Sequence, residues 1–173
     1  YSLLMTSRFR EELAGAGGIV ACGLARLGAE VHLLAELGDH ADGRELYEEI
    51  GRRGVRREGI RRRTGARSAF TLIFADEASG RPRQVATFQG PALEFCLRAE
   101  DYMPLLERCR LAYSCNYFLL PRLREGIPEL FRQARERGAR TAYDANAGDG
   151  WEEPARLKLL RDETRLGDIK LLN

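Results

Sequence analysis

The chain has 173 residues, of which 44% are hydrophobic and 31% charged, an ordinary composition for a globular domain. Its 28 Lys and Arg residues stand against 26 Asp and Glu, so the net charge of +2 gives no reason to expect nucleic acid or an anionic membrane as a partner. No apolar run approaches the ~20 residues of a membrane span, and the N-terminal residues lack a signal-peptide pattern. We therefore expect a single domain that works in the cytoplasm.

The four cysteines show no spacing typical of a metal site or of a disulfide framework. Only two histidines accompany them, and no C-x-x-C is present. We therefore expect free thiols in a reducing compartment and no metal site built from cysteines and histidines. The cysteines are Cys22, Cys96, Cys109 and Cys115.

The first informative stretch is a glycine-rich turn at Gly15, Gly17 and Gly18, which leads into a predicted helix over 18–27 and a strand over 30–36. A helix N-terminus presents unpaired N–H groups and a partial positive charge, which suit a hydroxyl- or phosphate-rich small molecule. Glycines would let such a ligand approach the backbone. The alternative is a tight turn with a close contact between helix and sheet.

A second amphipathic helix is predicted over 42–53, and an arginine-rich stretch follows over 52–67. Binding of nucleic acid is one interpretation of these arginines. The stretch has no aromatic residues that could stack on bases, and acidic residues at 45, 48, 49 and 58 lie close by. A solvated, charge-balanced surface is the interpretation we favour.

Two β-rich runs, 69–74 and 84–88, enclose a Ser-, Gly- and Pro-bearing segment and predict a hairpin that projects as a flap. The remaining chain alternates between helices and short apolar strands, as in a parallel sheet covered on both faces. The sequence therefore predicts an α/β fold. The later elements are expected at 100–108 (helix), 110–115 (strand), 124–137 (helix), 140–143 (strand), 154–162 (helix) and 169–172 (strand).

Polar side chains follow the predicted strands where these strands end. They are Asn116, Asp144, Asn146 and Asn173. Each alone is explained by a helix cap or an Asx-turn. Together they indicate a binding site, because ligands of open parallel sheets bind beyond the carboxyl ends of the strands.

In this order, the motifs resemble those of the ribokinase-like (PfkB) carbohydrate kinase family over nearly the whole chain. The segment GGIVACGLARLGAEVHLLAELGDHADG resembles the first signature of the family. YDANAGDGW resembles its D-x-N segment, and DIKLLN resembles the strand that opens its N-x-x-E motif. The other matches are Gly54-Val55, the hairpin over 69–88 and Gly90-Pro91.

This resemblance implies a ribokinase-like three-layer sandwich with a central, mostly parallel sheet and a small β lid. Residues 1–173 would form one domain, with the lid made mainly by 69–88 and with 1–9 as a candidate addition. The implied activity is transfer of a phosphoryl group from ATP to a sugar hydroxyl, with magnesium (Mg2+). The resemblance also implies that two lids can pair edge to edge in a homodimer.

The resemblance further implies two groups of site residues. The sugar would be bound by Gly17, Gly18, Cys22, Gly43 and Asn116. The phosphates and their metal ion would lie near Asp144, Asn146 and Asn173.

Some residues depart from the family pattern. Cys22 stands where the family has a sugar-binding asparagine, and His40, beside Asp39, stands where it has an acid. The G-A-G-D motif with the catalytic aspartate has no match up to Asn173, since 147–149 lacks the preceding glycine and comes too early. We therefore expect an N-terminal part of a longer kinase, inactive by itself.

Two other functions stay open. A dinucleotide-binding oxidoreductase would use Gly15-x-Gly17 for the pyrophosphate and Glu36 for the ribose, but it needs a strand directly before Gly15, where the sequence is the charged SRFREELA. A non-catalytic member of the kinase fold, which binds a sugar or nucleotide, is favoured by Cys22 and His40.

Overall fold

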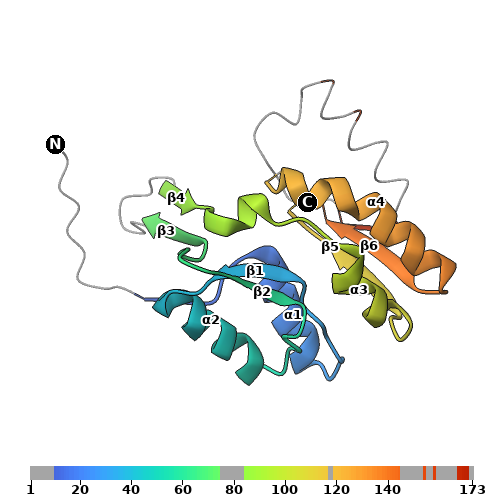
Figure 1. Ribbon diagram of the computed structural model, residues 1–173, viewed down its shortest axis with the longest axis horizontal. Coiled ribbons are helices and arrows are strands. Elements are labelled where there is room, and N and C mark those ends of the chain that lie inside the picture. The colour runs from blue at the N-terminus through green and yellow to red at the C-terminus, as the bar shows by residue number, and fades with distance from the viewer. Residues whose placement is uncertain are drawn as a thin grey trace.

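The structure is a computed structural model that describes residues 10–74, 84–116, 119–144 and 167–171, together with Pro154 and Lys158. Two groups of parallel strands, each with two helices, lie next to each other in Figure 1. This arrangement confirms the predicted α/β class. No helix in the described ranges is both long and apolar enough to cross a membrane.

The first group of elements contains β1 and β2, which pair in parallel from Ala35 opposite Ile60 to Gly38 opposite Arg63. Its elements are α1 (Ala16–Arg26), β1 (Ala35–Gly38), α2 (Ala41–Arg52) and β2 (Ile60–Arg63). Both helices pack on the strands through one apolar cluster, to which Ala21 and Cys22 of α1 and Ile50 of α2 belong. The buried members of this cluster are Ala21, Cys22, Leu37, Ile50, Val55 and Ile60.

Two sequence predictions were wrong in this group. The strand expected over 30–36 begins only at Ala35, and before it His32 forms an isolated bridge with Arg56. The arginine-rich stretch is not a solvated surface throughout, because its residues Ile60–Arg63 form β2. The side chain of Arg61 is only 22% exposed, and acidic partners compensate its charge.

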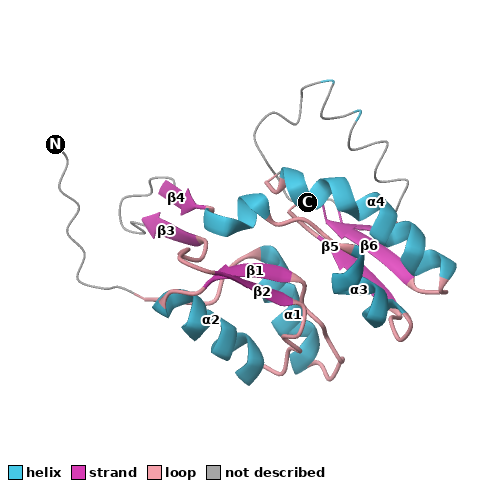
Figure 2. Cartoon of the chain, in the orientation of Figure 1, coloured by secondary structure: helices cyan, strands magenta, loops and turns pink. Residues whose placement is uncertain are grey.

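The predicted hairpin is confirmed as the antiparallel pair of β3 (Phe70–Phe74) and β4 (Gln84–Phe88). Phe70 lies opposite Phe88, with the ring centroids 5.4 Å apart. All ten residues of the two strands are exposed. Figure 2 shows the pair standing out beside the β1–β2 group. Residues 1–9, considered as an addition to this lid, lie outside the described residues.

The second group contains a parallel sheet in the order β5-β6-β7. Its elements are the 3₁₀ helix η1 (Gly90–Glu94), α3 (Ala99–Leu106), β5 (Leu111–Ser114), α4 (Pro121–Glu136), β6 (Arg140–Asp144) and β7 (Ile169–Leu171). Residues of α3, α4, β5 and β6 share a second apolar cluster, in which Phe131 and Ala134 are fully buried. Of the helix expected at 154–162, only Pro154 and Lys158 are described.

The described parallel strands are hydrogen-bonded as two sheets, rather than as the single central sheet expected from the sequence. Residues of the first group that contact the second include Leu34 and Arg61. Leu34, just before β1, packs against the apolar cluster of the second group. Arg61 of β2 reaches Asp101 of α3.

Candidate active site

The N-terminus of α1 has no side-chain cap. Gly15 is its N-cap residue, with φ 85° and ψ 127°. The first bond within the helix runs from the Ile19 N–H to the Gly15 carbonyl, at 2.9 Å. The N–H groups of Ala16, Gly17 and Gly18 precede this bond, so helix geometry directs them beyond the first turn.

This helix start lies against the end of β5. A Cβ atom added to Gly17 would be 3.4 Å from the Sγ of Cys115, the residue that directly follows β5. Asn116 comes next, with φ 62° in the left-handed region that asparagine tolerates. Its carbonyl accepts hydrogen bonds from the N–H groups of Leu119 and Leu120, at 3.0 and 3.1 Å, and so turns the chain toward α4.

The end of β6 belongs to the same neighbourhood. The Tyr113 hydroxyl donates a hydrogen bond to the Asp144 Oδ2, at 3.4 Å. Burial raises the pKa of the Cys115 thiol to about 11, against a hydrogen bond from Tyr113 that lowers it. Burial also raises the pKa of Tyr113, so this hydroxyl keeps its proton at neutral pH and remains a donor. A row of neighbouring residues therefore runs from the start of α1 across the strand ends. Its members are Gly17, Cys115, Tyr113 and Asp144.

Two of the predicted sugar-binding residues, Cys22 and Gly43, are buried, whereas Gly18 lies in the first turn of α1 beside Gly17. Gly18 faces Leu13, whose Cδ2 would be 3.4 Å from an added Cβ. Cys22 is buried in the first apolar cluster; burial raises the pKa of its thiol, and Arg53 at the end of α2 opposes this shift. Gly43 packs tightly, because a Cβ there would overlap the Gly38 carbonyl and lie 2.6 Å from the Ser68 Oγ.

The predicted phosphate-site residues are only partly described. Asp144 is, whereas Asn146 and Asn173 lie outside the described residues. Within the described part of the chain, no cluster of three or more His, Cys, Asp or Glu side chains could hold a metal ion.

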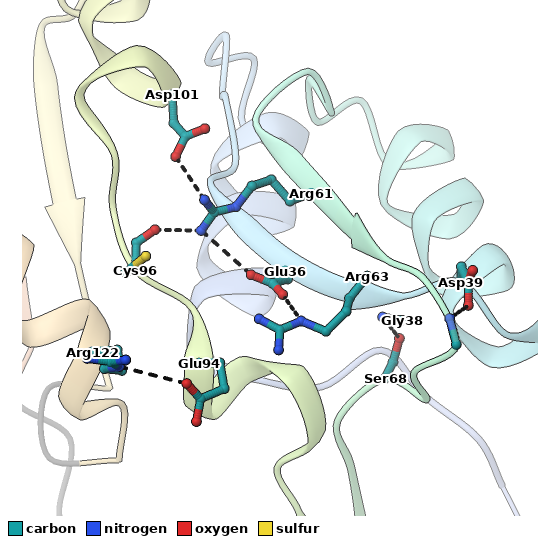
Figure 3. A network of polar contacts seen from close by, with 11 residues as sticks. Glu36, Gly38, Asp39, Arg61, Arg63, Ser68, Glu94, Cys96, Asp101 and Arg122 are labelled. Carbon is teal, nitrogen blue, oxygen red and sulfur yellow. Dashed lines mark hydrogen bonds and ion pairs between the residues drawn. The ribbon is translucent and has the colours of Figure 1, made fainter.

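Sequence reasoning missed a polar network between the two groups of elements (Figure 3). The Glu36 carboxylate, whose side chain is 8% exposed, forms ion pairs with Arg61 at 3.6 Å and with Arg63. Arg61 also pairs with Asp101 at 3.3 Å and donates to the Cys96 carbonyl. From the sequence alone, one could have predicted only that Glu36 in β1 can pair with two arginines of the adjacent strand β2.

The same network argues against the dinucleotide-binding alternative. That alternative requires Glu36 to bind a ribose, but two arginines hold its carboxylate. It also requires a strand leading into Gly15, and residues 10–14 form neither helix nor strand. Both structural requirements of the alternative are unmet.

The described residues form an α/β protein in which a glycine-led helix lies beside the residues at the ends of a parallel sheet. The chain belongs to the pfkB family of carbohydrate kinases, whose family model matches residues 2–160. The resemblance found in the sequence is therefore confirmed.

Fructokinases are among its similar proteins. "Probable fructokinase-4" of Arabidopsis thaliana is 30% identical over 149 residues, which cover 84% of this chain and 44% of that protein. The crystal structure of fructokinase from Xylella fastidiosa has a TM-score of 0.75 at 25% identity, and the match covers 98% of this chain and 54% of the fructokinase chain. A PfkB protein from Polaromonas sp. JS666 has a TM-score of 0.83 at 20% identity, covering 98% of this chain and 58% of its own. The chain spans about half the length of the curated relatives it matches.

Proposed function

We propose that the protein containing this chain transfers a phosphoryl group from ATP to a hydroxyl of a sugar. The observation that carries the proposal is the closeness of Gly17 to Cys115, because it brings the uncapped start of α1 to the strand end that leads to Asp144. We propose fructose or a similar sugar as the acceptor, since the similar proteins are named fructokinases. A fructokinase structure with bound ATP is a further neighbour and supports ATP as the donor.

The sugar would lie at the start of α1. The N–H groups of Gly17 and Gly18 would donate to its hydroxyl groups, and Asn116 would approach from the end of β5. We assign Cys22 and Gly43 an indirect part in sugar binding, because both are buried among core atoms. They would hold the helix and the Gly38–Gly43 loop in place.

Asp144 would face the phosphates, with Asn146 and Asn173 as its predicted companions. Magnesium fits this assignment, because Mg2+ is commonly held by one or two carboxylates together with phosphate oxygens. When bound, it would neutralise the charge of the transferring phosphoryl group. The Tyr113 hydroxyl would keep the Asp144 carboxylate oriented toward the strand ends.

The chain would contribute mainly positioning and exclusion of water, on which phosphoryl transfer depends more than on covalent chemistry. The helix start and the strand ends would fix the two substrates next to each other. The β3–β4 lid would cover them during the reaction. Among the described residues, we assign none as the base that takes the proton of the acceptor.

The lid would also join two copies of the protein in a homodimer. An isolated two-stranded sheet is marginally stable in water, and this sheet has apolar side chains exposed on both faces. Phe70, Leu72 and Phe74 lie on one face, and Ile73 and Val85 on the other. One face can cover the sugar, while the other would lie toward the partner copy when the two lids pair edge to edge.

We propose the cytoplasm as the location, and small molecules rather than nucleic acid or membrane as the further partners. All four cysteines are free, which suits a reducing compartment. The net charge of +2 supplies no strong attraction to polyanions.

Isothermal titration of the chain with fructose, Mg-ATP and NAD, combined with an assay of fructose phosphorylation, tests the proposal. We expect fructose and ATP to bind and NAD not to bind. Phosphorylation by this chain, or by any longer protein that contains it, would establish the activity. Binding of NAD without binding of sugar would contradict the proposal, and binding of sugar without turnover in the longer protein would favour a non-catalytic role.

A further inference from the structure

Ser68 joins the segment that leads into the lid to the end of β1 by a hydrogen bond. It lies two residues before β3, its side chain is 2% exposed, and its Oγ accepts a hydrogen bond from the Gly38 N–H at 2.9 Å (Figure 3). The same Oγ lies 2.6 Å from the position that a Cβ on Gly43 would occupy. The serine hydroxyl therefore fills the narrow space left by two glycines of the loop Gly38–Gly43.

A second hydrogen bond between the same two segments lies beside the first; we call the two together the fastening of the lid. The Asp39 Oδ1 accepts a hydrogen bond from the Gly65 N–H at 2.9 Å. A Cβ on Gly38 would overlap the Ala66 carbonyl, so the segment before the lid lies directly on this loop. An ion pair of 3.7 Å between Arg67 and Asp42 adds a more exposed contact.

The segment that follows the lid lies close to residues 65–69, which precede the lid. Gly90 follows β4 with φ +51°, and a Cβ there would be 2.8 Å from the Arg67 carbonyl and 3.4 Å from the Ala69 nitrogen. Both ends of the β3–β4 pair are therefore joined at residues 65–69. Those residues in turn are held by the loop Gly38–Gly43.

We propose that Asp39 and Ser68 are positioning residues that couple the Gly38–Gly43 loop to the lid, so that a sugar bound beside this loop changes the position of the lid. The coupling to sugar rests on the proposed function, whereas the fastening itself does not. A displacement of Gly38 or Asp39 would have to move Ser68 and Gly65, because the buried Gly38 N–H would otherwise lose its acceptor and the more exposed bond from the Gly65 N–H to Asp39 would break. The loop and the lid root therefore move as one unit.

Hydrogen exchange measured by mass spectrometry tests the fastening without a ligand. In the whole chain, Ser68→Ala should raise the amide exchange rates of the lid strands (70–74 and 84–88) and of the loop 38–43, each about tenfold. Asp39→Ala should do the same, whereas Asp39→Asn, which keeps an acceptor oxygen, should restore rates near those of the original chain. Ser114→Ala, a buried serine outside this region, is the matched control and should leave these segments unchanged. Unchanged exchange of the lid in both Ser68→Ala and Asp39→Ala would overturn the fastening.

The same measurement with saturating fructose tests the coupling. In the original chain, fructose should slow exchange at 38–43 and in the lid; in Ser68→Ala, it should slow exchange at 38–43 alone. Equal protection of the lid in both proteins would overturn the coupling. If fructose protects neither segment of the original chain, then the proposed function and the coupling to sugar both fail, while the ligand-free comparison still decides the fastening.

Discussion

Gly17 matters because it has no side chain where α1 begins against Cys115. Its position in the first turn gives its N–H group an outward direction, and its bare Cα leaves that group accessible. The sequence indicated this role through the glycine pair alone. The contact with Cys115 could not be predicted, because it joins residues almost a hundred positions apart.

Gly17→Ala should therefore separate binding from stability. A Cβ at 3.4 Å from the Cys115 Sγ is tolerable, and replacing a helical glycine can stabilise the folded state by up to ~1 kcal/mol. The added methyl group would take up space between the start of α1 and Cys115, next to the place where we put the sugar, so we expect fructose affinity to fall about tenfold, as ~1.4 kcal/mol corresponds to a factor of ten. Calorimetric titration and thermal unfolding measure the two effects.

Gly23→Ala is the matched control, since it lies in the same helix and an added Cβ there would meet no atom within 4 Å. It should gain similar stability and keep its affinity for fructose. Equal affinities in the two variants would remove Gly17 from the sugar site.

Cys115 gives a dependence of stability on alkaline pH. An unfolded cysteine ionises near pH 9.0, whereas burial raises the pKa of Cys115 in the folded state to about 11. Its contribution to stability is therefore complete below pH 9 and is lost as the pH rises toward 11. The loss should be ~2 kcal/mol at pH 11 and approach ~3 kcal/mol above it, at ~1.4 kcal/mol for each of the two pKa units.

Urea unfolding from pH 8 to 11, for the original chain and for Cys115→Ala, measures this loss. The difference between their free energies of unfolding should shrink as the pH rises, which also subtracts the titration of the tyrosines. A constant difference would show that the thiol is not buried as described.

Among the elements, β2 shows why part of the fold could not be predicted. Its sequence, Ile60–Arg63, has no apolar alternation, so its propensity favours a surface loop. The strand is stabilised by partners from other elements: Glu36 of β1, Asp101 of α3 and the ring of Phe95, over which Arg61 lies at 4.9 Å. By contrast, the β3–β4 hairpin was predictable, because local turn residues and alternating apolar residues specify it.

Arg61→Ala should destabilise the protein by ~3 kcal/mol. The variant would leave Asp101 without this partner and leave the nearly buried Glu36 with Arg63 alone, and breaking a buried ion pair on one side is costly. Arg56→Ala is the control, because its pair with Glu30 is exposed and 3.9 Å long, so a change below ~1 kcal/mol is expected. Chemical denaturation measures both, and equal effects would contradict a structural role for the network.

At the scale of the whole molecule, the order of elements was predictable and their assembly was less so. The alternation of helices and apolar strands led to the α/β class, and each predicted motif follows the next in the order of the family. How the two groups of strands meet depends on Leu34 and Arg61, whose long-range contacts leave no periodic signal. The tight packing of Gly43 was likewise hidden, since a glycine beside a ligand and a glycine beside a carbonyl look the same in a sequence.

The exposed lid predicts a homodimer. We expect the chain to sediment as a dimer at micromolar concentrations. Ile73→Glu and Leu72→Glu change opposite faces of the lid, and the variant on the dimer face should sediment as a monomer. Leu27→Glu, at the exposed leucine that directly follows α1, is the control and should not change the mass. A monomer in the original chain, at every concentration tested by analytical ultracentrifugation, would contradict the dimer.

The central claim is that the start of α1 and the ends of β5 and β6 form one site for a sugar and a nucleotide. Its most direct test is a map of amide chemical shifts in ¹⁵N-labelled chain, titrated in turn with fructose, Mg-ATP and NAD. The account predicts that fructose shifts the amides of Gly17, Gly18 and Asn116, and that Mg-ATP shifts the amide of Asp144. Shifts around Gly15 with NAD alone, or fructose shifts that leave Gly17 and Asn116 unchanged, would contradict it.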